Sequence, residues 1–115
     1  MTCVFCQIIR GELPATVIYE TDDWLVIADI NPQAAVHVLI ITKEHFASFR
    51  NLGNEQHYLM TSLMEVVQEV TEIVAADSYR LLTNSGREAG QTVMHLHWHL
   101  LAGSLKESSL ASEMR

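Results

Sequence analysis

The sequence predicts a single α+β domain in which a five-stranded, mostly antiparallel sheet is accompanied by one short and one long helix. Apolar residues recur at spacings of three and four across residues 59–74, which is the pattern of one buried helix face. Short apolar or alternating runs, bounded by turn residues, lie on both sides of that segment and predict strands. A chain of 115 residues can bury one ordinary core. We predict a single domain over residues 1–103 and a tail over residues 104–115.

The predicted elements follow in the order helix, three strands, helix, two strands. Residues 5–10 form the short helix, which Gly11 ends. The predicted strands are residues 16–20, 24–28, 36–41, 79–83 and 92–101. Asn54 is the predicted N-cap of the long helix. Because short turns connect the first three strands, the sheet should be mostly antiparallel.

Charge and hydropathy exclude several classes of partner. The net charge is −7, and the seven basic residues are scattered instead of forming the patch that a nucleic-acid backbone requires. No apolar run approaches the roughly 18–20 residues of a membrane span. Residues 1–5 lack the basic start and long apolar stretch of a signal peptide. We therefore expect a cytoplasmic protein without nucleic-acid or membrane partners.

Three histidines alternate with apolar residues near the end of the chain. On a strand, His95, His97 and His99 would line one face at intervals of about 6–7 Å, with Leu96, Trp98 and Leu100 on the other. Such a row of imidazoles suits either of two tasks. It can bind a metal ion, or it can attack a phosphorus atom while holding the surrounding oxygens.

The polar loop before the histidines favours the phosphate interpretation. Gly90 allows the backbone to approach an anion closely. Thr92 adds a hydroxyl donor, and Asn84 and Gln91 add amides. Neutral donors beside a row of histidines suit a phosphate better than a bare cation.

Cys3 and Cys6 form a C-x-x-C motif at the start of the chain. A structural disulfide is not expected in a reducing compartment. A thioredoxin-type redox site needs a strand before the motif, and none precedes it here. Two interpretations stay open, namely half of a zinc site or two ordinary thiols near a helix start.

The motif His-φ-His-φ-His-φ-φ, where φ is apolar, resembles the signature of the histidine triad (HIT) family. Residues 90–93 resemble that family's Gly-Gln-Ser/Thr-Val, and residues 5–15 resemble its opening helix. Residues 29–34 are similar to the Asp-Ile-x-Pro-Gln-Ala segment of the nucleotide-binding (Hint-like) branch, and residues 37–41 and 43–45 follow in the expected order. The resemblance covers nearly the whole chain. It implies a HIT-like fold and a homodimer paired through the long helix and the fourth strand.

The resemblance also implies hydrolysis of nucleoside 5′-phosphoramidates, AMP-amines above all, through a covalent nucleotidyl-histidine on His97. His99 would bind a phosphate oxygen, and His37 and His95 would support the histidine face. Asp29 would bind the ribose hydroxyls. The implied base contacts are Phe5, Ile27, Ile30 and Leu39, and the implied phosphate contacts are Asn84, Gly90, Gln91, Thr92 and Val93. Without the resemblance, His37 could be a core histidine and Asp29 a turn cap.

By the same resemblance, Cys3, Cys6, His45 and His95 would bind a structural zinc ion. Because no acidic cluster accompanies the triad, no divalent metal should be required for the chemistry. Two other functions stay open. One is a dinucleoside polyphosphate hydrolase or nucleotidyl transferase that uses the same nucleophile, and the other is a non-catalytic module that binds nucleotide or zinc.

Overall fold

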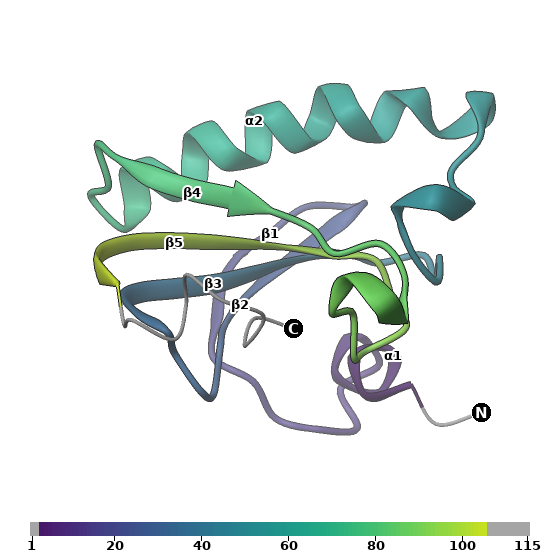
Figure 1. Ribbon diagram of the computed structural model, residues 1–115, viewed down its shortest axis with the longest axis horizontal. Helices are drawn as coiled ribbons and strands as arrows, with labels where there is room; N and C mark the ends of the chain where they lie inside the picture. Colours follow the sequence, from purple (N-terminus) through teal and green to yellow (C-terminus); the bar gives the residue numbers. More distant parts are fainter. Residues whose placement is uncertain (1–2, 106–115) are drawn as a thin grey trace.

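The computed structural model describes residues 3–105 and confirms the α+β class. Five strands form one sheet in the order β1-β2-β3-β5-β4, and every neighbouring pair is antiparallel (Figure 1). The strands are β1 (Val17–Glu20), β2 (Trp24–Ala28), β3 (Ala34–Thr42), β4 (Tyr79–Leu82) and β5 (His97–Leu105). All five predicted strands are therefore present, and the longest two, β3 and β5, pair in the interior of the sheet.

Two α-helices lie on opposite sides of this sheet, as Figure 1 shows. They are α1 (Val4–Ile9) and α2 (His57–Ile73). The prediction that Asn54 is the N-cap of the long helix is wrong. Asn54 begins a single 3₁₀ turn, and α2 starts after it with Gln56 as its N-cap. The turn stabilises itself, because the backbone N–H of Gly53 donates to the side-chain oxygen of Gln56 at 2.7 Å.

The main core fills the space between the sheet and α2. The predicted apolar stripe on α2 is buried there as far as Val70, against side chains that lie on the same face of the sheet, whereas Ile73 at the end of the helix is exposed. This core consists of Trp24, Val26, Val38, Ile40, Leu96, Trp98 and Leu100 with Leu59, Leu63, Val66, Val67 and Val70. The one polar group of Trp24 is satisfied, since its indole N–H donates to the hydroxyl of Ser62 at 2.8 Å.

The opposite face carries the histidines and is covered by α1. Strand register places two rows of side chains across it, namely Leu25–Ile41–His97 and Ile27–Leu39–His99. Phe5 of α1 packs on the apolar members of both rows. The alternation read from the sequence is therefore confirmed, with histidines on one face and Trp98 and Leu100 on the other.

The start of β5 differs from the prediction. The strand begins at His97 instead of residue 92, so His95 precedes it. The backbone N–H of Leu96 donates to the carbonyl of Phe46 in the preceding loop at 2.6 Å, which takes this donor out of the strand ladder. Thus His97 and His99 share the strand face, whereas His95 lies in an irregular segment beside α1.

The other end of β5 reaches Leu105, two residues beyond the predicted domain end at residue 103. The rest of the predicted tail, residues 106–115, lies outside the described residues. Within residues 3–105, the structure contains no helix that is both long and apolar enough to cross a membrane.

Candidate functional site

A cavity of about 200 Å³ opens on the histidine face, between α1 and the strands β2, β3 and β5. It is lined by Val4, Phe5, Ile8, Ile27, Ala28, Asp29, Ile30, Leu39, Val93, His97 and His99. Every residue predicted to contact the base or the ribose lies on this cavity. Sequence reasoning missed Val4 and Ile8, although their spacing of four on a helix beside Phe5 could have indicated a shared wall.

His97 is buried and lines this cavity in a single tautomer. Its Nδ1 lies 2.6 Å from the backbone carbonyl of His95. A carbonyl only accepts hydrogen bonds, so Nδ1 carries the proton and Nε2 keeps the lone pair. The ring of Phe5 contacts His97 edge-on at a centroid distance of 5.0 Å. The arrangement orients the His97 ring, and in its neutral form Nε2 is the nucleophilic nitrogen.

His99 has the tautomer opposite to that of His97, because of a hydrogen bond from His37. The backbone N–H of Gln33 donates to Nδ1 of His37 at 3.0 Å, which leaves the proton of His37 on Nε2. That Nε2 lies 2.9 Å from Nδ1 of His99 and donates to it, so His99 carries its own proton on Nε2. Burial lowers the pKa of His37, although the carboxylate of Asp29 acts in the other direction. His37 is thus a neutral relay that makes His99 a hydrogen-bond donor.

Asp29 caps a turn and also lines the cavity. Its Oδ1 accepts the backbone N–H of Asn31 at 2.8 Å, and its Oδ2 lies 3.3 Å from Nε2 of His37. A carboxylate offers about four lone-pair positions, so these contacts leave acceptor capacity toward the cavity. The turn-cap interpretation is confirmed, and it is compatible with ribose binding.

The loop before His95 is held mainly by its own hydrogen bonds. The buried amide of Gln91 donates to the carbonyls of Ala47 at 2.6 Å and Val93 at 2.9 Å, and it accepts the N–H of Gly86 at 2.8 Å. The N–H of Gly90 donates to the carbonyl of Arg87. The side chain of Gln91 and the N–H of Gly90 therefore shape the loop, and neither residue lines the cavity.

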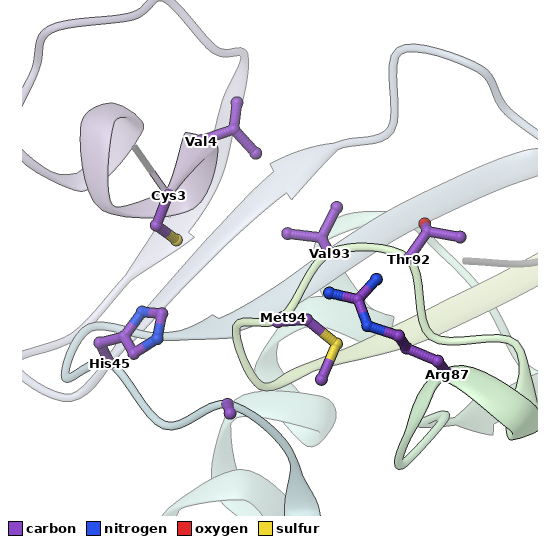
Figure 2. Close-up of a pocket in the computed structure, with 8 residues that line it drawn as sticks. Cys3, Val4, His45, Arg87, Thr92, Val93 and Met94 are labelled. Atoms are coloured by element: carbon purple, nitrogen blue, oxygen red, sulfur yellow. The ribbon is translucent and has the colours of Figure 1, made fainter. Parts of the chain in front are cut away.

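A second, larger cavity of about 460 Å³ adjoins the first, because Val4 and Val93 line both. Figure 2 shows this groove, with Thr92 and Arg87 on one side and Cys3 and His45 on the other. Of the predicted phosphate contacts, Thr92 and Val93 lie on the groove, whereas Asn84, Gly90 and Gln91 do not.

Cys3, Cys6, His45 and His95 converge on one point beside α1. Nδ1 of His95 lies 3.1 Å from Sγ of Cys3, 3.5 Å from Sγ of Cys6 and 3.0 Å from Nδ1 of His45. The Nε2 of His95 donates to the carbonyl of Thr42 at 2.6 Å, so its Nδ1 has a lone pair and no proton. Burial lowers the pKa of His95 to about 4, so the ring is neutral near pH 7. Three groups thus approach a single lone pair.

This geometry fits a metal ion better than a set of hydrogen bonds. One lone pair accepts about one hydrogen bond, whereas one cation can bind all four groups. Zinc prefers tetrahedral sites of thiolates and imidazoles, whose ligand atoms lie roughly 3.3–3.8 Å apart. Burial and the neighbouring Cys3 thiol raise the pKa of Cys6, so a bound dication would have to displace its proton. The residues present therefore fit zinc.

A second group of Asp29, His37 and His99 also brings ligand-type atoms together. Here hydrogen bonds account for the short distances, because the N–H of Gln33 donates to Nδ1 of His37, and the Nε2–H of His37 faces Nδ1 of His99 at 2.9 Å and Oδ2 of Asp29 at 3.3 Å. The two groups are therefore different in kind, since one suits a cation and the other is a chain of hydrogen bonds.

Comparison with known proteins places these features in a family. The HIT domain model matches residues 10–105. The adenosine 5′-monophosphoramidase of Schizosaccharomyces pombe is 34% identical over 110 residues, covering 96% of this chain and 80% of that protein. A HIT family hydrolase from Clostridium thermocellum is 47% identical, with a TM-score of 0.85 over 88% of this chain and 90% of that one. A zinc-bound histidine triad protein from Mycobacterium smegmatis is 34% identical, with a TM-score of 0.76 over 90% and 76% of the two chains. Sequence, fold and the histidines at the cavity agree, and the chain belongs to the HIT (histidine triad) family.

Proposed function

We propose that this protein hydrolyses purine nucleoside 5′-phosphoramidates of the AMP-amine type, with His97 as the nucleophile. The observation that carries the proposal is the pair of opposite tautomers at one cavity. His97 presents a lone pair on Nε2, and His99 presents an N–H. Attack on phosphorus requires a nitrogen lone pair, and stabilisation of a phosphate oxygen requires an N–H donor. The phosphoramidase activity of the Schizosaccharomyces pombe relative supports the same class of substrate.

In this proposal the base occupies the apolar part of the cavity, against Phe5, Ile27 and Leu39. Asp29 accepts hydrogen bonds from the ribose hydroxyls. A cavity of about 200 Å³ is smaller than typical ligand cavities of about 300–1,000 Å³, so only the base and part of the sugar would be enclosed. The α-phosphate would then lie at the mouth, next to His97 and His99.

The reaction has two displacements at phosphorus. Nε2 of His97 attacks the α-phosphorus, the P–N bond to the amine breaks, and its electron pair goes to the departing nitrogen, which takes up a proton. The hydroxyl of Thr92 donates that proton in this proposal. Water then attacks the same phosphorus and loses a proton that restores the hydroxyl of Thr92, the bond to Nε2 breaks, and the nucleoside monophosphate leaves. The N–H of His99 holds a phosphate oxygen through both steps.

A zinc ion bound by Cys3, Cys6, His45 and His95 would act structurally, as a crosslink between α1 and the loops before α2 and β5. None of these four residues is the proposed nucleophile, and no step of the reaction needs the ion. The thiols of Cys3 and Cys6 are free in the structure, and metal binding requires that they stay reduced. This supports the cytoplasm as the site of action.

Competing substrates test the proposal. We expect faster turnover of an AMP-amine than of a diadenosine polyphosphate, in the presence and absence of a chelator. A preference for the diadenosine polyphosphate would instead support a dinucleoside polyphosphate hydrolase or nucleotidyl transferase with the same nucleophile. Tight binding of AMP without turnover of either substrate would indicate a non-catalytic nucleotide-binding module.

We also propose that the protein is a homodimer. The supporting observation is a set of large apolar side chains exposed on the outer side of α2 and on the edge strand β4, namely Tyr58, Met64, Ile73, Tyr79 and Leu81. Register pairs Leu81 with Leu100, which lies on the sheet face that packs against α2. The exposed residues of β4 thus adjoin the helix, and together they form one surface suited to a second copy.

A further inference from the structure

We propose that metal binding by Cys3, Cys6, His45 and His95 and nucleotide binding in the cavity beside His97 are positively coupled through helix α1. The inference rests on the proposed function, because it assumes that the cavity takes a nucleotide. It assigns to Cys3, Cys6 and Phe5 a positioning role toward the nucleophile.

The first step is that α1 depends on its surroundings for order. It has six residues, and an isolated helix of that length is not stable in water. Cys3 is its N-cap, and the N–H of Cys6 donates to Sγ of Cys3 at 3.4 Å. His45 and His95, the other two members of the metal group, belong to different loops. A bound metal would therefore tie this short helix to the body of the protein at two of its residues.

The second step is that the same helix forms a wall of the nucleotide cavity. Val4, Phe5 and Ile8 all line it. Phe5 lies between the two cysteines in sequence, and its ring contacts His95 and His97 edge-on at centroid distances of 5.7 and 5.0 Å. Any displacement of Cys3 and Cys6 therefore moves the ring that packs on the nucleophile and on the predicted base position.

The third step is that His95 belongs to both sites. Its Nδ1 points to the thiols and to His45, while its backbone carbonyl accepts a hydrogen bond from the Nδ1–H of His97. The carbonyl of Thr42 holds the other ring nitrogen of His95. A metal that fixes His95 thus also fixes the acceptor that sets the tautomer and orientation of His97.

The metal group is accessible in the folded protein, so its occupancy can change. His45 is exposed, and Cys3 and His45 face the groove of about 460 Å³ shown in Figure 2. A chelator or a metal donor can approach through that groove without unfolding the sheet.

Coupling between two binding sites is reciprocal, since each ligand must change the affinity for the other by the same factor. The experiment measures the effect of each ligand on the affinity for the other, on the whole protein. AMP affinity is determined by titration calorimetry for protein stripped with a chelator and for protein reloaded with Zn²⁺. Zinc affinity is determined by competition with a chromophoric chelator, with and without saturating AMP. We expect Zn²⁺ to strengthen AMP binding about tenfold and AMP to strengthen Zn²⁺ binding by the same factor.

Two variants locate the coupling. Phe5→Leu keeps every metal ligand but removes the ring that contacts His97, so we expect the coupling factor to fall below about threefold while Zn²⁺ still binds. Phe49→Leu is the matched control, since Phe49 packs on Trp98 on the opposite face of the sheet, and its coupling should equal that of the wild type. Cys6→Ser should show one AMP affinity with or without Zn²⁺, which also controls for binding of Zn²⁺ by free AMP.

Amide hydrogen exchange gives a readout independent of affinity. The N–H groups of Gln7 and Arg10 donate to the carbonyls of Cys3 and Cys6 within α1, and we expect either ligand to slow their exchange. The inference is overturned if AMP affinity is the same in both forms, if the two factors differ, or if the wild type does not bind Zn²⁺. If AMP binds no form of the protein, the proposed function itself fails.

Discussion

At the residue scale, one hydrogen bond to each ring gives different tautomers to two histidines on the same strand. The Nδ1–H of His97 donates to a backbone carbonyl, and Nδ1 of His99 accepts a hydrogen bond from the neutral ring of His37. The two rings are otherwise alike, since both are buried and both line the cavity. The hydrogen bond at Nδ1 of each ring therefore decides whether its Nε2 carries a lone pair or an N–H.

This arrangement predicts an acid limb in the pH profile. Protonation of His37 would turn its Nδ1 into a donor that faces the N–H of Gln33, and this repulsion would displace the ring from its position beside His99. Burial lowers the pKa of His37 from its ordinary value of 6.5. We expect kcat/KM for an AMP-amine to be constant near neutrality and to fall with a midpoint below pH 6.5. A loss of activity centred above pH 6.5 would contradict the neutral relay.

The same group affects stability with a defined sign. Because the pKa of His37 is lower in the folded than in the unfolded state, the unfolded chain binds more protons between those two values. Folding stability is then fully present above pH 6.5 and decreases as the pH falls toward the folded pKa.

At the element scale, the long strand β5 supports both cores and must approach β3 closely. Gly103 lies near its end with φ of 77°, and a Cβ at this position would be 2.8 Å from Cβ of Ala35. A side chain here would meet both an unfavourable backbone conformation and a neighbour on the adjacent strand.

We expect Gly103→Ala to destabilise the protein by about 2–4 kcal/mol, the sum of left-handed strain and overpacking. Gly11→Ala is the matched control, because Gly11 has φ of 78° but a Cβ added to it would meet no other atom within 4 Å. Gly11→Ala should lower the free energy of unfolding by about 1–2 kcal/mol, from backbone strain alone. Denaturant unfolding of the two variants measures the difference, and equal losses would refute the close approach at Gly103.

Local patterns in the sequence were sufficient for the elements and for the face on which the histidines lie. A period of two in residues 95–101 separates polar from apolar side chains on the two faces of a strand, and a period near 3.6 in residues 59–74 reflects one buried helix face, so both are visible without tertiary information. The residues predicted to contact the base and the ribose do line one cavity, although the sequence indicated them only through the resemblance to a known family.

What could not be predicted depends on backbone groups distant in sequence. The carbonyl of Phe46 accepts the N–H of Leu96, so that the strand starts later than predicted, and the carbonyl of Thr42 fixes the ring of His95. Every residue has a carbonyl, so no residue type signals either contact. Likewise, the pairing of His37 with His99 depends on the register of β3 and β5, which periodicity does not set.

At the scale of the whole molecule, the exposed apolar surface of α2 and β4 is the feature that a single copy leaves unexplained. Met64 on α2 is 60% exposed and Leu81 on β4 is 40% exposed, and β4 is an edge strand. Unpaired sheet edges and exposed apolar patches favour association between protein chains. Pairing of two copies through α2 and β4 would cover both features at once.

We expect the wild type to be a dimer by light scattering coupled to gel filtration, and Met64→Lys to be mostly monomeric at micromolar concentration. Val17→Lys is the matched control, since Val17 is 52% exposed on β1 at the opposite edge of the sheet. That variant should stay dimeric. Dissociation by Val17→Lys but not by Met64→Lys would place the interface on the other edge.

The most direct test of the account concerns the covalent bond to His97. A rapid-quench reaction with an AMP-amine, followed by peptide mass spectrometry, should find adenylate attached to His97 in the wild type. In His97→Ala the adduct should be absent and turnover should fall by at least about 10³-fold, whereas His57→Ala, which changes an exposed histidine at the start of α2, should retain both. Turnover of His97→Ala at the wild-type rate, or an adduct on another residue, would contradict the assignment of His97 as the nucleophile.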